Sequence, residues 1–179
     1  MTLPMTLKLK GKRVAILLEE GFEDLEFWVP LMRMQEEGAA VTVVGLAAGK
    51  VVKSKTGGLT AAADVAAADV QASDFDGLIV PGGWAPDKLR RYPAVTTLVR
   101  EVYEQGKIVG MICHAGLVGI SAGIVAGHRS TGSLGIKDDL LNAGATWVDE
   151  PALRDGNLVW GRVVPDIPFF CRELVAALA

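Results

Sequence analysis

The chain has 179 residues, of which 50% are hydrophobic and 22% are charged, which suits one packed core and is short for two. Its net charge is −3 and no basic patch is evident, so nucleic acid and anionic membranes are excluded as main partners. We therefore expect a single domain over residues 1–179, with about residues 1–11 as an N-terminal extension.

The N-terminal residues hold too few apolar side chains for a signal peptide, and no later run approaches the length of a membrane span. We expect a cytoplasmic protein. Its two cysteines, Cys113 and Cys171, lie far apart without a Cys-x-x-Cys spacing, which indicates free thiols in a reducing compartment. The chain has two histidines, so no zinc-type cluster is predicted, and we expect no metal and no cofactor.

Strand-like and helix-like segments alternate along the chain. Short apolar runs predict strands, and apolar residues at helical spacing predict helices. Gly38 marks the end of the first helix. Pro30 should bend or shift that first helix. In chain order we predict a strand at 13–18, a helix within 19–38, a strand at 40–46, a hairpin at 51–60 turning at Gly57 and Gly58, a short helix at 64–72, a strand at 77–80, a helix at 94–105, a strand at 108–112, a helix at 133–144, strands at 146–149 and 158–164, and a final helix at 168–179. The pattern predicts an α/β fold, a mainly parallel sheet with helices on both faces.

The strand predicted at 108–112 runs directly into Cys113, and helical composition follows from Gly116. A reactive residue at a sharp turn from strand to helix is a nucleophile elbow. Backbone N–H groups of the first helical turn would face the sulfur and favour the thiolate. Alternatively, Cys113 is a small buried apolar residue.

A second glycine-rich turn follows the strand predicted at 77–80. Gly82 and Gly83 leave backbone without side chains at the carboxyl end of a strand, where open α/β sheets bind ligands. If Cys113 attacks a carbonyl, the N–H groups of His114 and Gly83 could hold the developing negative charge. The alternative is an ordinary turn. Trp84, beside these glycines, is expected in a pocket wall or an interface.

Two further residues receive structural rather than catalytic interpretations. His128 lies in a polar turn and is expected at the surface. Cys171 lies among apolar residues of the last helix and is expected in the core.

Six segments of the chain carry a family resemblance: 23–26 with Pro30, 81–87, 112–116, 135–149, 155–159 and 162–166. Together they resemble the ThiJ/PfpI superfamily, in particular its PfpI-type intracellular cysteine protease and general stress protein branch. The resemblance covers nearly the whole chain. It implies a flavodoxin-like sandwich, an exposed nucleophilic cysteine, and obligate homodimers that in some members assemble into hexamers.

The resemblance also implies roles for acidic residues. Glu26 would contact the cysteine, and a carboxyl desolvated there should keep its proton and donate it to an ionised sulfur. Glu23 would form an ion pair beside the site or at an interface. His114 would pair with Asp87 of a neighbouring subunit, although adjacent side chains such as Cys113 and His114 usually diverge on a sharp turn. Relatives often carry Cys-His-Gly-Pro, whereas this chain has Cys-His-Ala-Gly at 113–116 and lacks the proline.

Three functions fit these residues. In the first, Cys113 adds to a small reactive carbonyl such as methylglyoxal or its early protein adducts, while Glu26 and His114 move protons. In the second, Cys113, His114 and Asp87 form an intracellular peptidase. In the third, Cys113 is oxidised in a sensor or protective protein and no reaction is catalysed. A glutamine amidotransferase is excluded, because no histidine follows His128.

Overall fold

The computed structural model describes residues 7–179, which form a seven-stranded sheet in the order β10-β11-β7-β6-β1-β2-β5. All neighbouring strands are parallel except β10 and β11, which are antiparallel. The strands are β1 (Arg13–Leu17), β2 (Ala40–Gly45), β3 (Val51–Lys53), β4 (Thr60–Ala62), β5 (Val65–Ala66), β6 (Gly77–Val80), β7 (Ile108–Ile112), β8 (Arg129–Ser130), β9 (Thr146–Trp147), β10 (Ala152–Asp155) and β11 (Leu158–Gly161).

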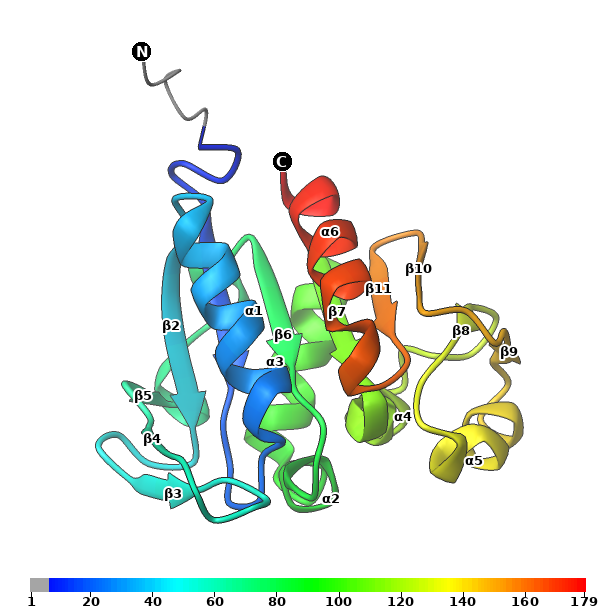
Figure 1. The fold of residues 1–179 in the computed structure, drawn as a ribbon, viewed down its shortest axis with the longest axis horizontal. Helices are drawn as coiled ribbons and strands as arrows, with labels where there is room; N and C mark the ends of the chain where they lie inside the picture. The colour runs from blue at the N-terminus through cyan, green and yellow to red at the C-terminus, as the bar shows by residue number, and fades with distance from the viewer. Residues whose placement is uncertain (1–6) are drawn as a thin grey trace.

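Helices cover both faces of this sheet. Helices α1 and α6 pack together on the face that is nearer the viewer in Figure 1, and α3 and α4 pack together on the other face. The α-helices are α1 (Asp24–Glu36), α2 (Ala85–Leu89), α3 (Pro93–Glu104), α4 (Gly116–Ala122), α5 (Lys137–Asn142) and α6 (Ile167–Leu178). Single 3₁₀ turns lie at Ala67–Asp69, Ala72–Asp74, Cys113–Ala115, Leu134–Ile136 and Val164–Asp166.

The central strands are buried because helices cover them on both sides. Every residue of β6 and β7 is buried, which explains why these strands are continuous apolar runs in the sequence. The arrangement is a mostly parallel sheet between two helical layers, so the predicted flavodoxin-like α/β sandwich is confirmed.

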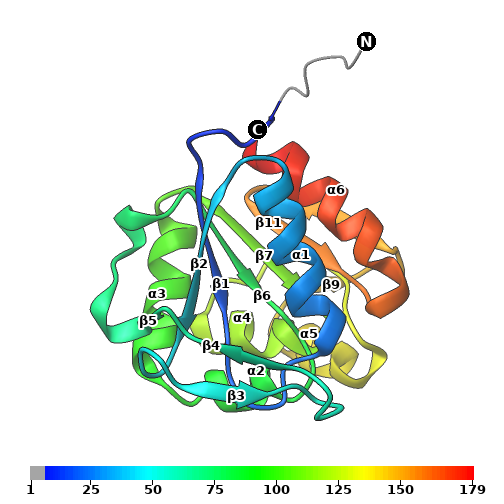
Figure 2. The ribbon, with the colours of Figure 1, turned by 60° about the vertical axis from the view of Figure 1, so that its left-hand side comes forward.

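Two small strand pairs lie outside the main sheet. β3 and β4 form an antiparallel hairpin, as predicted, and β8 pairs with β9 in parallel. In Figure 2 the hairpin lies at the lower edge of the molecule, where β1 and β6 end. The hairpin therefore lies beside the carboxyl ends of the parallel strands.

The structure differs from the sequence prediction in several elements. The helix predicted at 64–72 is wrong: β5 pairs there with the end of β2, and two 3₁₀ turns follow. The first helix begins only at Asp24, and it continues through Pro30. The strand predicted at 158–164 ends at Gly161, and β10 was not predicted at all.

Only part of the predicted N-terminal extension can be compared with the structure. Residues 1–6 lie outside the described residues. Leu9 is fully buried in the core, and its N–H donates to the carbonyl of Glu37, so this part of the extension is fixed at the C-terminal end of α1. Within residues 7–179, no helix is both long enough and apolar enough to cross a membrane.

Candidate active site

Three neighbouring parallel strands, β1, β6 and β7, bring the predicted site residues together. The chain runs from β1 to β2 on one side, and β6 and β7 lie on the other side of β1, so β1 and β6 flank the point where the strand order reverses. Ligand crevices of open α/β sheets form at such a point, beyond the carboxyl ends of the strands. Glu26 follows β1, Gly82 and Gly83 follow β6, and Cys113 follows β7.

Cys113 occupies the predicted nucleophile elbow. It is the first residue of the 3₁₀ turn between β7 and α4, and its φ of 61° is the only positive value at a non-glycine residue within the described chain. A side chain in this left-handed region costs about 1–3 kcal/mol. The Cys113 carbonyl accepts the N–H of Ser133 at 3.1 Å. A Cβ at Gly132 would approach that carbonyl to 2.8 Å, so the glycine permits the close contact that holds the turn.

Glu26 reaches the sulfur from the first turn of α1. Its side chain is fully buried, and Oε2 accepts the N–H of Gly82 at 2.9 Å. Oε1 has no hydrogen-bond partner among the described residues. Burial, and next the negative charge of Glu23, raise the pKa of Glu26 to about 7. This carboxyl can therefore accept or release a proton near neutral pH.

The thiol of Cys113 and the carboxyl of Glu26 form a coupled pair. Burial, and next the negative charge of Glu26, raise the pKa of Cys113 to about 12, although the backbone N–H groups of His114 and Gly83 lower it. The backbone N–H groups favour the thiolate, as expected, but burial and the negative charge of Glu26 outweigh them, so the net shift of the Cys113 pKa is upward. At neutral pH the sulfur must release its proton to a nearby base when it attacks.

Glycine is required at the two positions opposite the cysteine. A Cβ at Gly82 would lie 2.3 Å from Oε2 of Glu26 and 2.7 Å from Cβ of Cys113. Gly83 has a φ of +80°, and a Cβ there would lie 2.5 Å from the backbone nitrogen of Glu23. The turn after β6 thus contacts both the carboxyl and the cysteine, and the N–H of Gly83 faces the sulfur.

His114 lies beside the nucleophile even though the two residues are adjacent in sequence. Its Nδ1 is 3.3 Å from Sγ of Cys113. The ring also lies against Gly135, where a Cβ would approach Nε2 to 3.2 Å. Partial burial, and next the charge of Lys55, lower the pKa of His114 below its usual value. The imidazole is therefore neutral at pH 7 and can accept a proton.

The other acidic candidates, Asp87 and Glu23, have partners within their own protomer. Asp87 lies in α2 at the cavity and pairs with Arg91 one turn later, so within one protomer its carboxylate is engaged by that arginine. Glu23 forms no ion pair in residues 7–179; its Oε2 caps α1 by accepting the N–H groups of Leu25 and Glu26 at 2.8 Å each. Within one protomer Glu23 therefore acts as a helix cap, because it immediately precedes the helix, and an ion pair of Glu23 at a subunit interface stays a prediction.

A cavity of about 450 Å³ opens over the sulfur. It is lined by Lys55, Gly83, Trp84, Asp87, Lys88, Cys113, His114 and Leu117. Trp84 forms part of the cavity wall, which is one of the two positions expected for it, and 64% of its surface is exposed. Sequence reasoning missed both lysines and Leu117. Lys88 directly follows the 81–87 motif, but nothing in the sequence distinguishes Lys55 from a solvated hairpin lysine.

The two remaining predictions give one confirmation and one difference. Cys171 is buried in α6, as expected, and burial raises its pKa to about 12. His128 is not simply a surface residue: its Nε2 is 2.8 Å from the hydroxyl of Tyr103, and its Nδ1 is 3.1 Å from Asp155. Within residues 7–179 no cluster of three or more histidine, cysteine or acidic side chains is suited to a metal ion.

The fold and the cysteine elbow together define a flavodoxin-like protein with a cysteine at the carboxyl end of β7, one of its buried inner strands. The model of the DJ-1/PfpI family matches residues 12–177, and the chain belongs to that family. A protein from Pyrococcus abyssi named a deglycase is 40% identical over 166 residues, which cover 93% of this chain and 99% of that protein. General stress protein 18 of Bacillus subtilis is 38% identical over 169 residues, which cover 94% of this chain and 98% of that protein.

A solved structure shows the same fold. The crystal structure of a two-domain protein from Anabaena variabilis, with DJ-1/ThiJ/PfpI-like and ferritin-like domains, superimposes with a TM-score of 0.91 at 39% identity. The match covers 93% of this chain and 48% of that protein. The similarity therefore extends over nearly all of this chain.

Proposed function

We propose that this protein is a cysteine-dependent enzyme that acts on small reactive carbonyls, such as 2-oxoaldehydes and their early adducts on amines. The observation that carries the proposal is the placement of Cys113 Sγ in a small cavity, between the buried carboxyl of Glu26 and a neutral imidazole at 3.3 Å. The deglycase name of relatives supports carbonyl chemistry, and the general stress protein name supports a protective role.

The first step is addition of the thiol to the aldehyde. The S–C bond forms, the thiol proton passes to the Glu26 carboxylate, and the carbonyl oxygen gains negative charge. The N–H groups of His114 and Gly83 face the sulfur, and the oxygen of the attacked carbonyl lies two bonds from that sulfur, within reach of these donors. Proton return to that oxygen gives a hemithioacetal.

The second step is an internal proton shift. Neutral His114 removes the proton from the former aldehyde carbon, and a proton is returned to the neighbouring carbon as its carbonyl becomes a hydroxyl. The product is a thioester of a 2-hydroxy acid. Water then breaks the C–S bond, the 2-hydroxy acid leaves, and Cys113 regains its proton. One carbon is oxidised and its neighbour is reduced, so the step needs no external oxidant or reductant.

The peptidase alternative has less support from the geometry. A Cys-His-Asp peptidase needs an acid that orients the imidazole, and within one protomer no described carboxylate is hydrogen-bonded to His114; the Asp87 expected for this role would come from a neighbouring subunit and would have to leave its pair with Arg91. The carbonyl reaction needs no such orienting acid. We therefore place small-carbonyl chemistry ahead of proteolysis.

Methylglyoxal consumption by the fully reduced protein tests this proposal, with the product identified by mass spectrometry or NMR. We expect lactate from the wild type, and loss of lactate formation in Cys113→Ser. Cys171→Ala is the matched control, because the second thiol is buried in α6, away from the cavity.

Methylglyoxal consumption without lactate, at the rate of a simple thiol, would contradict the proposed enzymatic activity. Casein or peptide cleavage that depends on Cys113 would then favour the peptidase. An intact-mass gain of two oxygens at low peroxide, without catalysis, would favour the protective oxidation function.

A further inference from the structure

Two lysines border the cavity above the nucleophile. Lys55 comes from the turn between β3 and β4, and Lys88 comes from α2, so two segments far apart in sequence contribute them. Neither lysine takes part in an ion pair within residues 7–179. The one carboxylate in the cavity lining, that of Asp87, is paired with Arg91. The cavity thus presents two uncompensated positive charges.

The other titratable groups near the sulfur offset these charges only in part. His114 is neutral at pH 7 because partial burial lowers its pKa. Glu26 is fully buried and is not part of the cavity lining, and when it is ionised its single negative charge leaves a net positive charge from the two lysines. The charge of Lys55 lowers the pKa of both Glu26 and His114, so its ammonium acts electrostatically on the reacting groups.

The rest of the wall strengthens this effect. Trp84 and Leu117 supply an apolar surface that excludes water from one side of the cavity. A cleft with apolar walls and one sign of charge raises the local concentration of oppositely charged ligands. A neutral molecule such as methylglyoxal gains nothing from that field.

We propose that Lys55 and Lys88 form an anion-binding subsite, and that the substrates are carbonyl compounds carrying a carboxylate a few bonds from the reactive aldehyde. This inference rests on the proposed function and specifies its substrate class. The lysines bind the carboxylate while Sγ of Cys113 attacks the aldehyde. Carboxylate-bearing 2-oxoaldehydes and carboxylate-bearing aldehyde adducts fit this description.

The chemistry is the same as for the neutral substrate. With 4,5-dioxopentanoate, the thiol adds to the aldehyde, a proton moves from that carbon to its neighbour, and water hydrolyses the resulting thioester. The product is 2-hydroxyglutarate, and the distal carboxylate is unchanged. Water is the only co-reactant.

The first test measures the charge preference of Cys113 without requiring turnover. Cys113 is alkylated with iodoacetate, which is anionic, and with iodoacetamide, which is neutral, in a Cys171→Ala background. The rate constant for iodoacetate divided by that for iodoacetamide reports the electrostatic field at the sulfur. This ratio does not depend on the fraction of thiolate, because both reagents react with the same thiolate. We expect a ratio about tenfold higher in the parent protein than in Lys55→Met/Lys88→Met.

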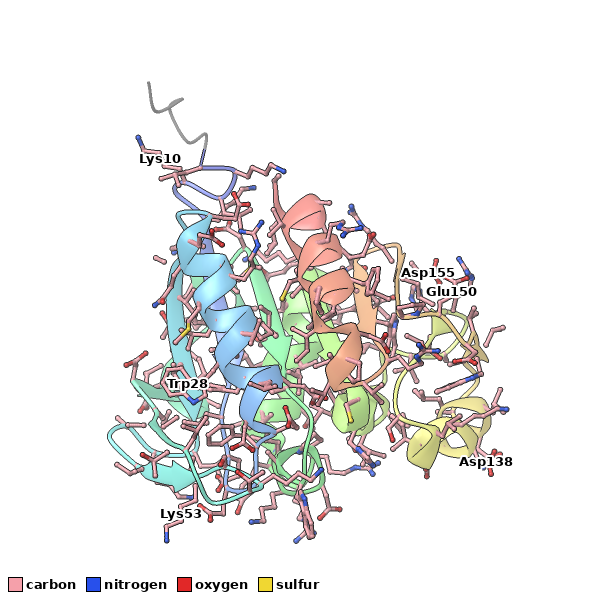
Figure 3. All side chains as sticks on the ribbon, viewed as in Figure 1. Lys10, Trp28, Lys53, Asp138, Glu150 and Asp155 are labelled. Carbon is pink, nitrogen blue, oxygen red and sulfur yellow. The ribbon has the colours of Figure 1, made fainter. Side chains whose placement is uncertain are left out.

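Each single variant should give an intermediate ratio, and raising the salt from about 0.05 to 0.5 M should lower the ratio of the parent protein. Lys53→Met is the matched control: it lies on the same hairpin, outside the cavity lining, and its side chain points away from the body of the protein in Figure 3. A ratio that is equal in the parent protein and the double variant would overturn the subsite.

The second test compares kcat/KM for 4,5-dioxopentanoate and methylglyoxal. We expect the wild type to favour the anionic substrate, and Lys55→Met/Lys88→Met to lose that preference about tenfold through KM. Turnover of methylglyoxal with no preference for the anion would overturn this inference and leave the proposed function intact. A lysine-dependent alkylation ratio without turnover of either substrate would overturn the proposed function and support the anion subsite.

Discussion

At the scale of single residues, the reactivity of Cys113 depends on a proton acceptor that has no contact with water. Glu26 is fully buried, and its pKa is raised to about 7, so the carboxyl is protonated below that pH and ionised above it. Only the ionised form can take the thiol proton. We expect iodoacetamide alkylation of Cys113 and methylglyoxal turnover to rise as the pH passes through about 7.

Glu26→Gln separates this role from simple packing. The amide is similar in size but does not titrate, so the rise near pH 7 should disappear and turnover should fall about 10²-fold or more. Removal of the carboxylate charge should also lower the pKa of Cys113, because that charge raises it. If Glu26→Gln kept the wild-type pH profile of alkylation, Glu26 would not be the acceptor.

At the scale of elements, the turn after β6 sets the distance between α1 and the cysteine elbow. Gly82 donates to Glu26 and contacts Cys113, and its own carbonyl accepts the N–H of Glu23 at 3.1 Å. Gly82→Ala would place a methyl 2.3 Å from Oε2 of Glu26. We expect lower Cys113 alkylation, turnover reduced about 10²-fold, and a free energy of unfolding lower by about 1–3 kcal/mol.

Gly58→Ala is the control for this substitution. An added Cβ there meets only Oγ1 of Thr56 at 3.5 Å, an ordinary contact, and the residue does not need a positive φ. Stability is measured by urea denaturation and alkylation by intact mass. Wild-type rates of alkylation and turnover in Gly82→Ala would mean that this turn is not required to hold Glu26 beside Cys113.

The strands β1, β6 and β7 were predictable because they are buried in the parallel part of the sheet, where both faces need apolar residues. Local sequence failed at 64–72, where alanine composition favours a helix but pairing of Val65 and Ala66 with the end of β2 determines the structure. Cys113 and Gly83 could be predicted from their glycine-rich turns. Lys55 could not, because only the tertiary position of the hairpin brings an exposed lysine to the cavity.

At the scale of the whole molecule, one face of α1 is left apolar and exposed. Leu25, Val29 and Met32 are 47%, 39% and 58% exposed, and their spacing of four and three residues places them on one side of the helix. Single exposed apolar residues are ordinary, but a row of them on one helix is typical of an interaction surface. A second copy of this chain, packed through the same face of α1, would remove this row of side chains from water.

We therefore expect a homodimer, or a larger assembly built from it, in which α1 lies at the interface. Val29→Asp/Met32→Asp should dissociate it, because two charges would be buried without partners. Sedimentation velocity measures the mass. Leu141→Asp is the control, since Leu141 is an exposed apolar residue of α5, away from α1 in Figure 1. A monomeric wild type would contradict the interface, as would a double variant of unchanged mass.

If the dissociated protomers kept full activity, the Asp87 carboxylate of a partner would have no part in orienting His114.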